Sequence, residues 1–246
     1  MHGHQIGDCT LLHANSLDAL PIIGAVDHIV TDPPYEQRMH EAAKAVSNFR
    51  VDKGPELRAI PFDSIDVIRA DFINLAQKVC EGWFVGFCNL EGVGKWADAI
   101  NTSEMKYKKA CVWVKPDATP QFNGQCPATG AECFVTAWCG SGRSKWNAGG
   151  KRGIYTHLTN SKDRHGVHPT EKPLRLMKEL LADFTNEGDL ICDPFMGSGT
   201  TGVACAQMGR KFVGVELNRN YFDIAVKRIG DAYKQPDFFV PQPVAI

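Results

Sequence analysis

The feature that most constrains this chain is Asp32-Pro33-Pro34-Tyr35, which directly follows the apolar run 26–31. Two consecutive prolines fit neither a helix interior nor a central strand. The chain must therefore leave a buried strand abruptly and present a carboxylate, backbone carbonyls and an aromatic ring at the strand end. Ligands of open α/β sheets bind at this edge. This acceptor cluster suits an amino group and the ring suits a flat base, whereas a simple turn is the alternative interpretation.

A second motif, Asp-Pro-Phe-Met-Gly-Ser-Gly-Thr-Thr-Gly, occupies residues 193–202. It follows the short apolar run 190–192 and opens a helical stretch, 200–208, that Gly209 closes. Glycines between a strand and a helix let backbone approach a ligand closely, beside free N–H groups at the helix start. Thr200 stands where a phosphate-binding P-loop needs Lys, which disfavours NTP hydrolysis. The spacing of Gly197, Gly199 and Gly202 fits a dinucleotide site, so an NAD-binding oxidoreductase is an alternative.

The next predicted strand, residues 211–216, ends in Glu216. This acid lies 23 residues after Asp193, close to the spacing expected for a carboxylate that accepts the hydroxyls of a ribose. A solvated acid at a strand end is the alternative interpretation.

Together these motifs resemble those of the S-adenosylmethionine-dependent DNA amino-methyltransferases, in the permuted order in which Asp-Pro-Pro-Tyr precedes the glycine loop. The resemblance runs from about residue 11 to residue 229. Residues 11–17 resemble the family's strand before Asp-Pro-Pro-Tyr, with Asn15 where the family usually has Asp. Residues 112–116 resemble its W-x-K strand, and residues 168–173 match its H-P-x-x-K-P element.

This resemblance implies an α/β protein with the Rossmann-like class I methyltransferase fold, a mostly parallel seven-stranded sheet with helices on both faces. One methyltransferase domain would span residues 1–246, with an inserted target-recognition segment at 119–167 and a loosely ordered tail at 235–246. The implied reaction moves a methyl group from S-adenosylmethionine to the exocyclic amine of a base flipped out of double-stranded DNA. N6 of adenine is favoured because D-P-P-Y is commoner among the adenine enzymes, and N4 of cytosine is the alternative.

The resemblance also assigns roles to residues. The expected catalytic residues are Asp32, Pro33, Pro34 and Tyr35. The Asp32 carboxylate and the Pro33 carbonyl would accept hydrogen bonds from the N–H groups of the target amine, and Tyr35 would stack on the base. The glycine loop would hold the methionine end of the cofactor, Glu216 its ribose and Lys172 its carboxylate. The full expected cofactor-binding set is Asn15, Asp32, Lys172, Asp193, Phe195, Gly197, Ser198, Gly199, Thr200 and Glu216.

A basic segment precedes the second motif. Residues 143–175 contain eight basic and two acidic side chains, interrupted by glycines and aromatic residues. This composition suits contacts with phosphates and base edges, and a solvated loop is the alternative. The residues expected to bind DNA are Arg143, Lys145, Lys151, Arg152, Lys162 and Arg164.

Several local patterns predict structural elements. The apolar run 83–88 and residues 133–138 predict strands. Apolar residues from 68 to 79 recur at helical spacing, and a helix with a buried face is expected to begin at Pro173. Residues 36–64 are polar and poorly periodic, which predicts an excursion beside the catalytic turn.

Composition limits the remaining possibilities. The net charge is −1, so the chain as a whole is not a basic nucleic-acid binder. Nine scattered cysteines without a C-x-x-C pair indicate reduced, buried thiols and no metal site. No run approaches the ~20 apolar residues of a membrane span, and the start lacks a secretory signal pattern. We expect a cytoplasmic protein of prokaryotic or phage type that acts on DNA as a homodimer.

Overall fold

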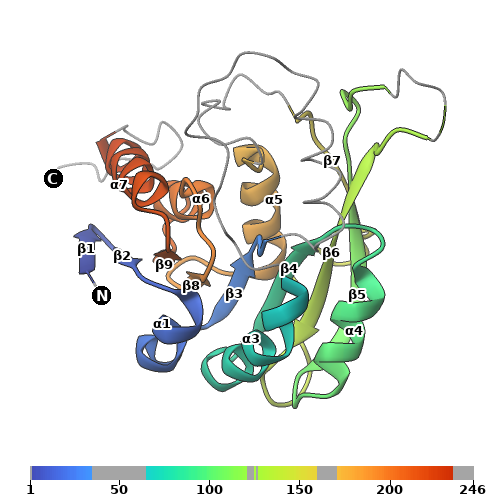
Figure 1. Ribbon diagram of the computed structural model, residues 1–246, viewed down its shortest axis with the longest axis horizontal. Coiled ribbons are helices and arrows are strands. Elements are labelled where there is room, and N and C mark those ends of the chain that lie inside the picture. The colour runs from blue at the N-terminus through green and yellow to red at the C-terminus, as the bar shows by residue number, and fades with distance from the viewer. Residues whose placement is uncertain (1, 35–64, 121–124, 126, 160–170, 235–246) are drawn as a thin grey trace, which may run out of the picture.

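A computed structural model describes residues 2–34, 65–120, 125, 127–159 and 171–234 (Figure 1). In these ranges the strands form one nine-stranded sheet with the order β1-β2-β9-β8-β3-β4-β6-β5-β7. The strands are β1 (His2–Ile6), β2 (Cys9–His13), β3 (His28–Thr31), β4 (Trp83–Cys88), β5 (Lys106–Val114), β6 (Ala131–Trp138), β7 (Ile154–Thr156), β8 (Leu190–Asp193) and β9 (Lys211–Glu216). The helices are α1 (Ser16–Ile23), α3 (Ile65–Val79), α4 (Val93–Asn101), α5 (Leu174–Phe184), α6 (Thr200–Gln207) and α7 (Arg219–Lys234).

The sheet is mostly parallel, as the resemblance implies. Strands β2, β9, β8, β3 and β4 run in one direction, and β6 runs antiparallel between β4 and β5. The predicted number of seven strands is wrong, because the described sheet also has a strand at each edge. β1 pairs antiparallel with β2, and the three-residue β7 pairs parallel with β5. Both added strands join through backbone hydrogen bonds and need no long apolar run.

Helices cover both faces of the sheet (Figure 1), which confirms that part of the predicted fold. Alternate residues of the strands point to opposite faces. Val30 and Val85 pack in the core beneath α5, α6 and α7, whereas their neighbours Ile29 and Phe84 pack beneath α1, α3 and α4. This burial on both faces explains why β4 is a continuous apolar run rather than an alternating one, and why all four residues of β3 are buried.

Several element boundaries follow from individual residues. β4 and β9 span the predicted ranges 83–88 and 211–216. The predicted helix at 173 begins one residue later, because Pro173 has an extended ψ of 132° and is the N-cap of α5. Gly209 adopts a φ of 69° just after α6, as a C-terminal glycine does.

The segment 119–167 is not one continuous insertion. Its residues 131–138 form β6, an internal strand of the sheet. That strand divides the segment into two parts at opposite ends of the strands. The β5–β6 connection lies at the carboxyl end of the parallel strands, and the stretch after β6 lies at their amino end. The predicted excursion at 36–64 and the predicted tail at 235–246 lie outside the described residues.

The cysteine side chains of the described ranges are free thiols. Seven of them are buried and Cys139 is half-buried. Within the same ranges, no cluster of three or more His, Cys, Asp or Glu side chains could hold a metal ion. No helix among the described residues has the length and apolarity needed to cross a bilayer.

Candidate functional site

The catalytic turn leaves the sheet at the carboxyl end of β3. Asp32 follows β3 directly, with Pro33 buried and Pro34 half-buried behind it; Tyr35 lies outside the described residues. The Asp32 Oδ2 atom accepts a hydrogen bond of 2.6 Å from Lys172 Nζ. Its other oxygen, Oδ1, is buried and has no hydrogen-bond partner in the described parts of the chain. The turn therefore offers one acceptor that the described residues leave unused.

Asp193 joins the two motifs. It ends β8, the strand next to β3, and is 2 % exposed. Its Oδ1 accepts 2.7 Å and 3.1 Å bonds from Thr31 Oγ1 and the Phe195 N–H, and its Oδ2 accepts a 2.7 Å bond from Thr201 Oγ1. Burial raises the pKa of Asp193 to about 6 against the lowering effect of these bonds. One carboxylate thus ties the catalytic strand to the loop and to the first turn of α6.

The glycine loop turns sharply between Asp193 and α6. Gly197 has a φ of 52° and Gly199 a φ of 85°, values that L side chains rarely adopt. A Cβ on Gly199 would lie 2.8 Å from the Cβ of Ala225, whereas one on Gly197 would meet no atom within 4 Å. Gly199 therefore allows α7 to pack closely, and Gly197 leaves an open backbone face for a ligand. Phe195, also predicted here, instead packs edge-on against Phe72 of α3, with ring centroids 5.1 Å apart.

Ser198 and Thr200 face α7 rather than open space. Ser198 Oγ and the Ser198 carbonyl accept bonds of 2.7 Å and 2.8 Å from Arg228, and Thr200 Oγ1 lies 3.4 Å from the same guanidinium. Arg228 also pairs with Glu171, whose side chain is 1 % exposed. The hydroxyls predicted to bind the cofactor therefore hold the loop in shape.

Glu216 ends β9 beside the loop. Its Oε2 accepts a 3.0 Å bond from the Gly197 N–H, and its Oε1 accepts a 2.7 Å bond from the Asn218 N–H. Burial raises the pKa of Glu216 to about 7, although these bonds lower it. Asn15 lies at the end of the adjacent β2, where its Oδ1 caps α1 by accepting a 2.8 Å bond from the Leu17 N–H. A buried acid and an exposed amide thus flank one side of the loop.

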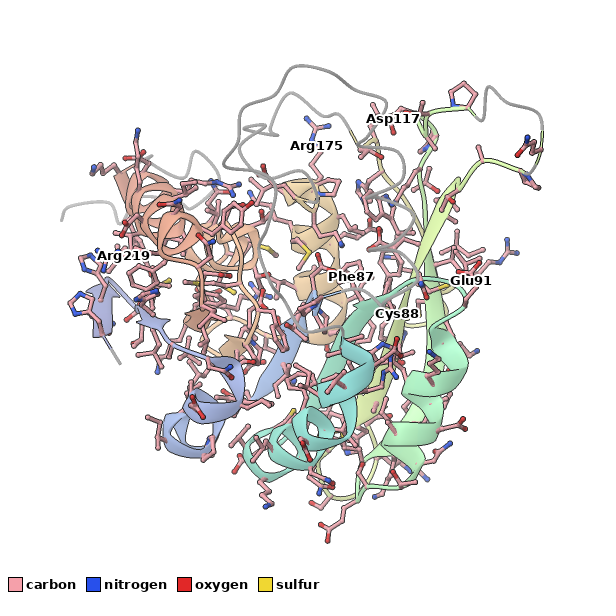
Figure 2. All side chains as sticks on the ribbon, in the orientation of Figure 1. Phe87, Cys88, Glu91, Asp117, Arg175 and Arg219 are labelled. Carbon is pink, nitrogen blue, oxygen red and sulfur yellow. The ribbon has the colours of Figure 1, made fainter. Side chains whose placement is uncertain are left out.

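Lys172 lies at the catalytic turn. Besides Asp32, its ammonium contacts Glu132 Oε1 at 2.8 Å and lies 4.9 Å from the ring centroid of Phe87. Phe87 belongs to the last residues of β4 (Figure 2). The structure therefore brings Lys172 to the predicted site, but its described partners are two carboxylates of the protein.

Two of the predicted DNA-binding residues within the described ranges, Arg143 and Lys145, lie far from Asp32. Arg143 and Lys145 are exposed and follow β6, whose last residue, Trp138, pairs with Trp83 at the start of β4. They lie at the amino ends of the parallel strands. The six residues of β4 place these amino ends about 17 Å from the carboxyl ends, where Asp32 lies.

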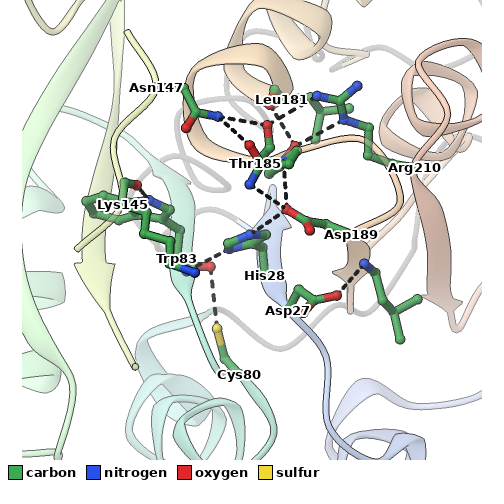
Figure 3. A network of polar contacts seen from close by, with 12 residues as sticks. Asp27, His28, Cys80, Trp83, Lys145, Asn147, Leu181, Thr185, Asp189 and Arg210 are labelled. Carbon is green, nitrogen blue, oxygen red and sulfur yellow. Dashed lines mark hydrogen bonds and ion pairs between the residues drawn. The ribbon is translucent and has the colours of Figure 1, made fainter. Parts of the chain in front are cut away.

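A polar network attaches this stretch to the amino ends of the strands (Figure 3). The Lys145 carbonyl accepts a hydrogen bond from Trp83 Nε1, and the Trp83 N–H donates to His28 Nδ1 at 2.8 Å. Asn147 Nδ2 donates to the Thr185 carbonyl after α5 at 3.0 Å. The backbone of the stretch is therefore fixed away from the catalytic turn.

The other basic residues differ in their surroundings. Lys151 pairs with Glu179 at 2.6 Å and with Asp183, so its ammonium is already used within the protein. Arg152 is exposed before β7, and Lys162 and Arg164 lie outside the described residues. Arg175 is exposed at the start of α5, from which its side chain extends (Figure 2).

Comparison with known proteins agrees with this arrangement. The family model described as DNA methylase, of the N6/N4 methyltransferases, matches residues 26–227. This chain belongs to the DNA methylase family. The match includes both motifs and the strands that carry them, and it removes the NAD-binding oxidoreductase as an interpretation.

Two curated relatives of this DNA methylase are bacterial. The Type II methyltransferase M2.LlaDCHI of Lactococcus lactis subsp. cremoris is 29 % identical, with 89 % of this chain and 88 % of that protein covered. The Type II methyltransferase M2.DpnII of Streptococcus pneumoniae is also 29 % identical, with 83 % and 82 % covered.

Solved structures share the fold of this DNA methylase. The M1.HpyAVI–SAM complex has a TM-score of 0.69 and 26 % identity, and the alignment covers 90 % of this chain and 98 % of that one. The cytosine-N4-specific PvuII DNA methyltransferase has a TM-score of 0.70, with 94 % and 93 % covered. Its identity is 16 %, so this second likeness concerns the fold alone.

Sequence reasoning missed three charged residues of this methylase site, Glu132, Glu171 and Arg228. Glu132 is an acid inside an otherwise apolar strand, 5 % exposed, and such a residue signals a buried partner. Glu171 and Arg228 carry no comparable signal, because the partners of Arg228, Glu171 and Ser198, are far from it in the sequence.

Proposed function

We propose that this DNA methylase transfers a methyl group from S-adenosylmethionine to the N6 amine of adenine in double-stranded DNA, with Asp32 as the acceptor that addresses the amine. The observation that carries the proposal is the unused Oδ1 of Asp32 beside the glycine loop. The hydrogen bond from Thr31 to Asp193 supports it, because it fixes the catalytic strand against the loop strand at 2.7 Å.

The residues around the loop fit the cofactor. The backbone at Gly197 is open on the side where a Cβ would stand, and Glu216 is a buried acid at the neighbouring strand end. Gly197 and the loop backbone would hold the methionine part, and Glu216 would accept the ribose hydroxyls. The SAM complex of M1.HpyAVI supports this assignment, since that protein has the same fold and is 26 % identical in sequence to this chain.

The chain's own contribution is positioning and fixed charge. An exocyclic amine is a weak nucleophile, because its lone pair is delocalised into the ring. S-adenosylmethionine supplies a methyl group attached to a positively charged sulfur. The Asp32 carboxylate and the Pro33 carbonyl would each accept one N–H bond and direct the nitrogen lone pair away from the ring plane. Burial raises the pKa of Asp32 to about 6, so Asp32 can also take up the proton that the methylated amine releases.

The choice of adenine rests on the resemblance of Asp-Pro-Pro-Tyr to the adenine enzymes, since the acceptors serve either amine. The test is methylation of plasmid DNA from a methylation-deficient host, followed by mass spectrometry of the nucleosides. We expect N6-methyladenine, and none with Asp32→Ala. A product that contains only N4-methylcytosine would overturn the assignment of the base.

We also infer that the enzyme acts as a homodimer on duplex DNA. A specific DNA interface usually buries about 1,000–2,500 Å² of protein surface. Arg143 and Lys145 lie at the opposite end of the strands from Asp32, so these two of the described basic residues are not beside the catalytic turn of their own copy. Light scattering at micromolar protein, with and without DNA, tests this inference, and a fully active monomer would contradict it. The bacterial relatives support a cytoplasmic location.

A further inference from the structure

Four charged side chains form a row that ends at the catalytic aspartate. Lys115 Nζ contacts Glu132 Oε2 at 2.7 Å, Glu132 Oε1 contacts Lys172 Nζ at 2.8 Å, and Lys172 Nζ contacts Asp32 Oδ2 at 2.6 Å. The four residues come from different places: the end of β5, the start of β6, the residue before the N-cap of α5, and the turn after β3. The fold thus assembles the row from segments far apart in the sequence.

The centre of the row is buried. The side chains of Lys172 and Glu132 are 6 % and 7 % exposed. Removing one partner of a buried ion pair leaves a charge without compensation and is strongly unfavourable. Lys172 is held from three directions, by Asp32, by Glu132 and by the face of the Phe87 ring. Its ammonium therefore has little freedom to leave the catalytic turn.

The two oxygens of Asp32 are consequently unequal. Lys172 occupies Oδ2, and Oδ1 is the acceptor left unused in the described chain. We propose that Lys172, held in place by Glu132, is a positioning residue for Asp32: it fixes the carboxylate through Oδ2 so that Oδ1 faces the target amine, and it keeps that carboxylate charged. This inference rests on the proposed function, and it gives Lys172 a role other than contact with the cofactor's carboxylate.

The electrostatics of the row agree with the geometry. Burial raises the pKa of Asp32 to about 6, Lys172 lowers it, and the nearby charges of Glu132 and Asp193 raise it. Burial also raises the pKa of Glu132, but Lys172 and Lys115 outweigh this effect and hold it below its ordinary value. Glu132 therefore remains charged and keeps Lys172 anchored.

Two variants separate this role from a cofactor-binding role. Lys172→Met removes the positive neighbour of Asp32, and Glu132→Gln removes a negative neighbour while its amide oxygen can still accept from Lys172. Glu132→Gln is nearly isosteric, so it tests the inference even where Lys172→Met does not fold. Lys95→Met is the matched control, because Lys95 also pairs with an aspartate, Asp66 at 2.8 Å, but on the surface around α3 and α4.

The first measurement is the titration of the Asp32 carboxyl by NMR in the protein without DNA, assigned with Asp32→Asn. We expect Lys172→Met to raise the pKa of Asp32 by about 1–3 units, Glu132→Gln to lower it, and Lys95→Met to leave it unchanged. An unchanged Asp32 titration in Lys172→Met, or in Glu132→Gln where Lys172→Met does not fold, would overturn the proposal.

The second measurement is the single-turnover rate of methyl transfer to plasmid DNA between pH 5.5 and 9, with the affinity for S-adenosylmethionine from calorimetry. The acid limb of the rate should follow the Asp32 titration in each variant, while cofactor affinity stays near that of the wild type. Weaker cofactor binding with an unshifted acid limb would assign Lys172 to the cofactor instead. A wild-type protein without activity on DNA would contradict the proposed function, and the NMR titration would still decide the role of Lys172.

Discussion

Replacing Asp193 by Asn tests how much the buried, ionised Asp193 carboxylate beside the glycine loop lowers the free energy of unfolding. The carboxylate is 2 % exposed, and its pKa rises from 3.8 to about 6 because of burial. The folded state therefore holds a proton on Asp193 more tightly than the unfolded state does. This contribution to stability is fully present below pH 3.8 and is lost as the pH rises through 6.

The size of the effect follows from the shift. At about 1.4 kcal/mol per pKa unit, raising the pKa from 3.8 to about 6 costs of the order of 3 kcal/mol at pH 8. About half of that loss, roughly 1.4 kcal/mol, falls between pH 5 and pH 8. An asparagine keeps the geometry: its oxygen can accept from Thr31 and the Phe195 N–H, and its amide can donate to the Thr201 hydroxyl, which accepts as well as donates.

The assay is urea or thermal unfolding of both proteins, without cofactor, at several pH values from 5 to 8. Relative to the wild type, Asp193→Asn should gain about 1.4 kcal/mol across this range, or about 3–6 °C in Tm for a chain of this size. Asp32 and Glu216 titrate in the same window, but they are present in both proteins and largely cancel in the difference. A stability difference that does not vary with pH would refute the reasoning.

Three further predictions concern the site directly. Asp32→Ala should lower the rate of methyl transfer at least about 100-fold while calorimetry finds S-adenosylmethionine bound almost as tightly as in the wild type; near-normal turnover would exclude Asp32 as the acceptor. Because the pKa of Glu216 is about 7, cofactor affinity should rise about tenfold from pH 6 to pH 8, and Glu216→Gln should abolish this rise; an equal pH dependence in both proteins would remove Glu216 from the site. Gly199→Ala should lower the free energy of unfolding by about 1–3 kcal/mol, because it adds strain at positive φ and a contact with Ala225. Gly197→Ala, which meets no neighbour, should cost about 1 kcal/mol, and equal losses in the two variants would contradict the packing argument.

The sequence predicts the strands that are buried on both faces and fails at the sheet edges. The run 83–88 is apolar throughout, and the run 211–216 has an apolar centre between Lys211 and Glu216; the boundaries of both match β4 and β9. β1 consists of exposed and half-exposed residues, and β7 has three residues with exposed ends. Such strands are specified by backbone pairing with a neighbour already in place, which leaves little trace in hydrophobic periodicity.

The same distinction applies to the site. Asp32 and Glu216 end predicted strands, and parallel strand ends meet at one sheet edge, so the sequence is sufficient to bring them together. A basic run does not reveal at which end of the strands it lies. The sequence therefore predicts Arg143 and Lys145 only as DNA-binding residues, and the structure places them at the opposite end of β4 from the catalytic turn. Glu132 could be identified only as a buried acid, because its two lysine partners come from other segments.

Two adjacent residues, Glu171 and Lys172, point to different halves of the site. Glu171 reaches Ser198 of the glycine loop through Arg228, and Lys172 reaches Asp32. One short stretch of backbone therefore connects the two halves. Thermodynamic reciprocity then links the two ligands: if filling the cofactor loop improves the hold on the target base by some factor, the base improves the hold on the cofactor by the same factor. Through Glu171 and Lys172, the cofactor and the target base would then bind with positive cooperativity.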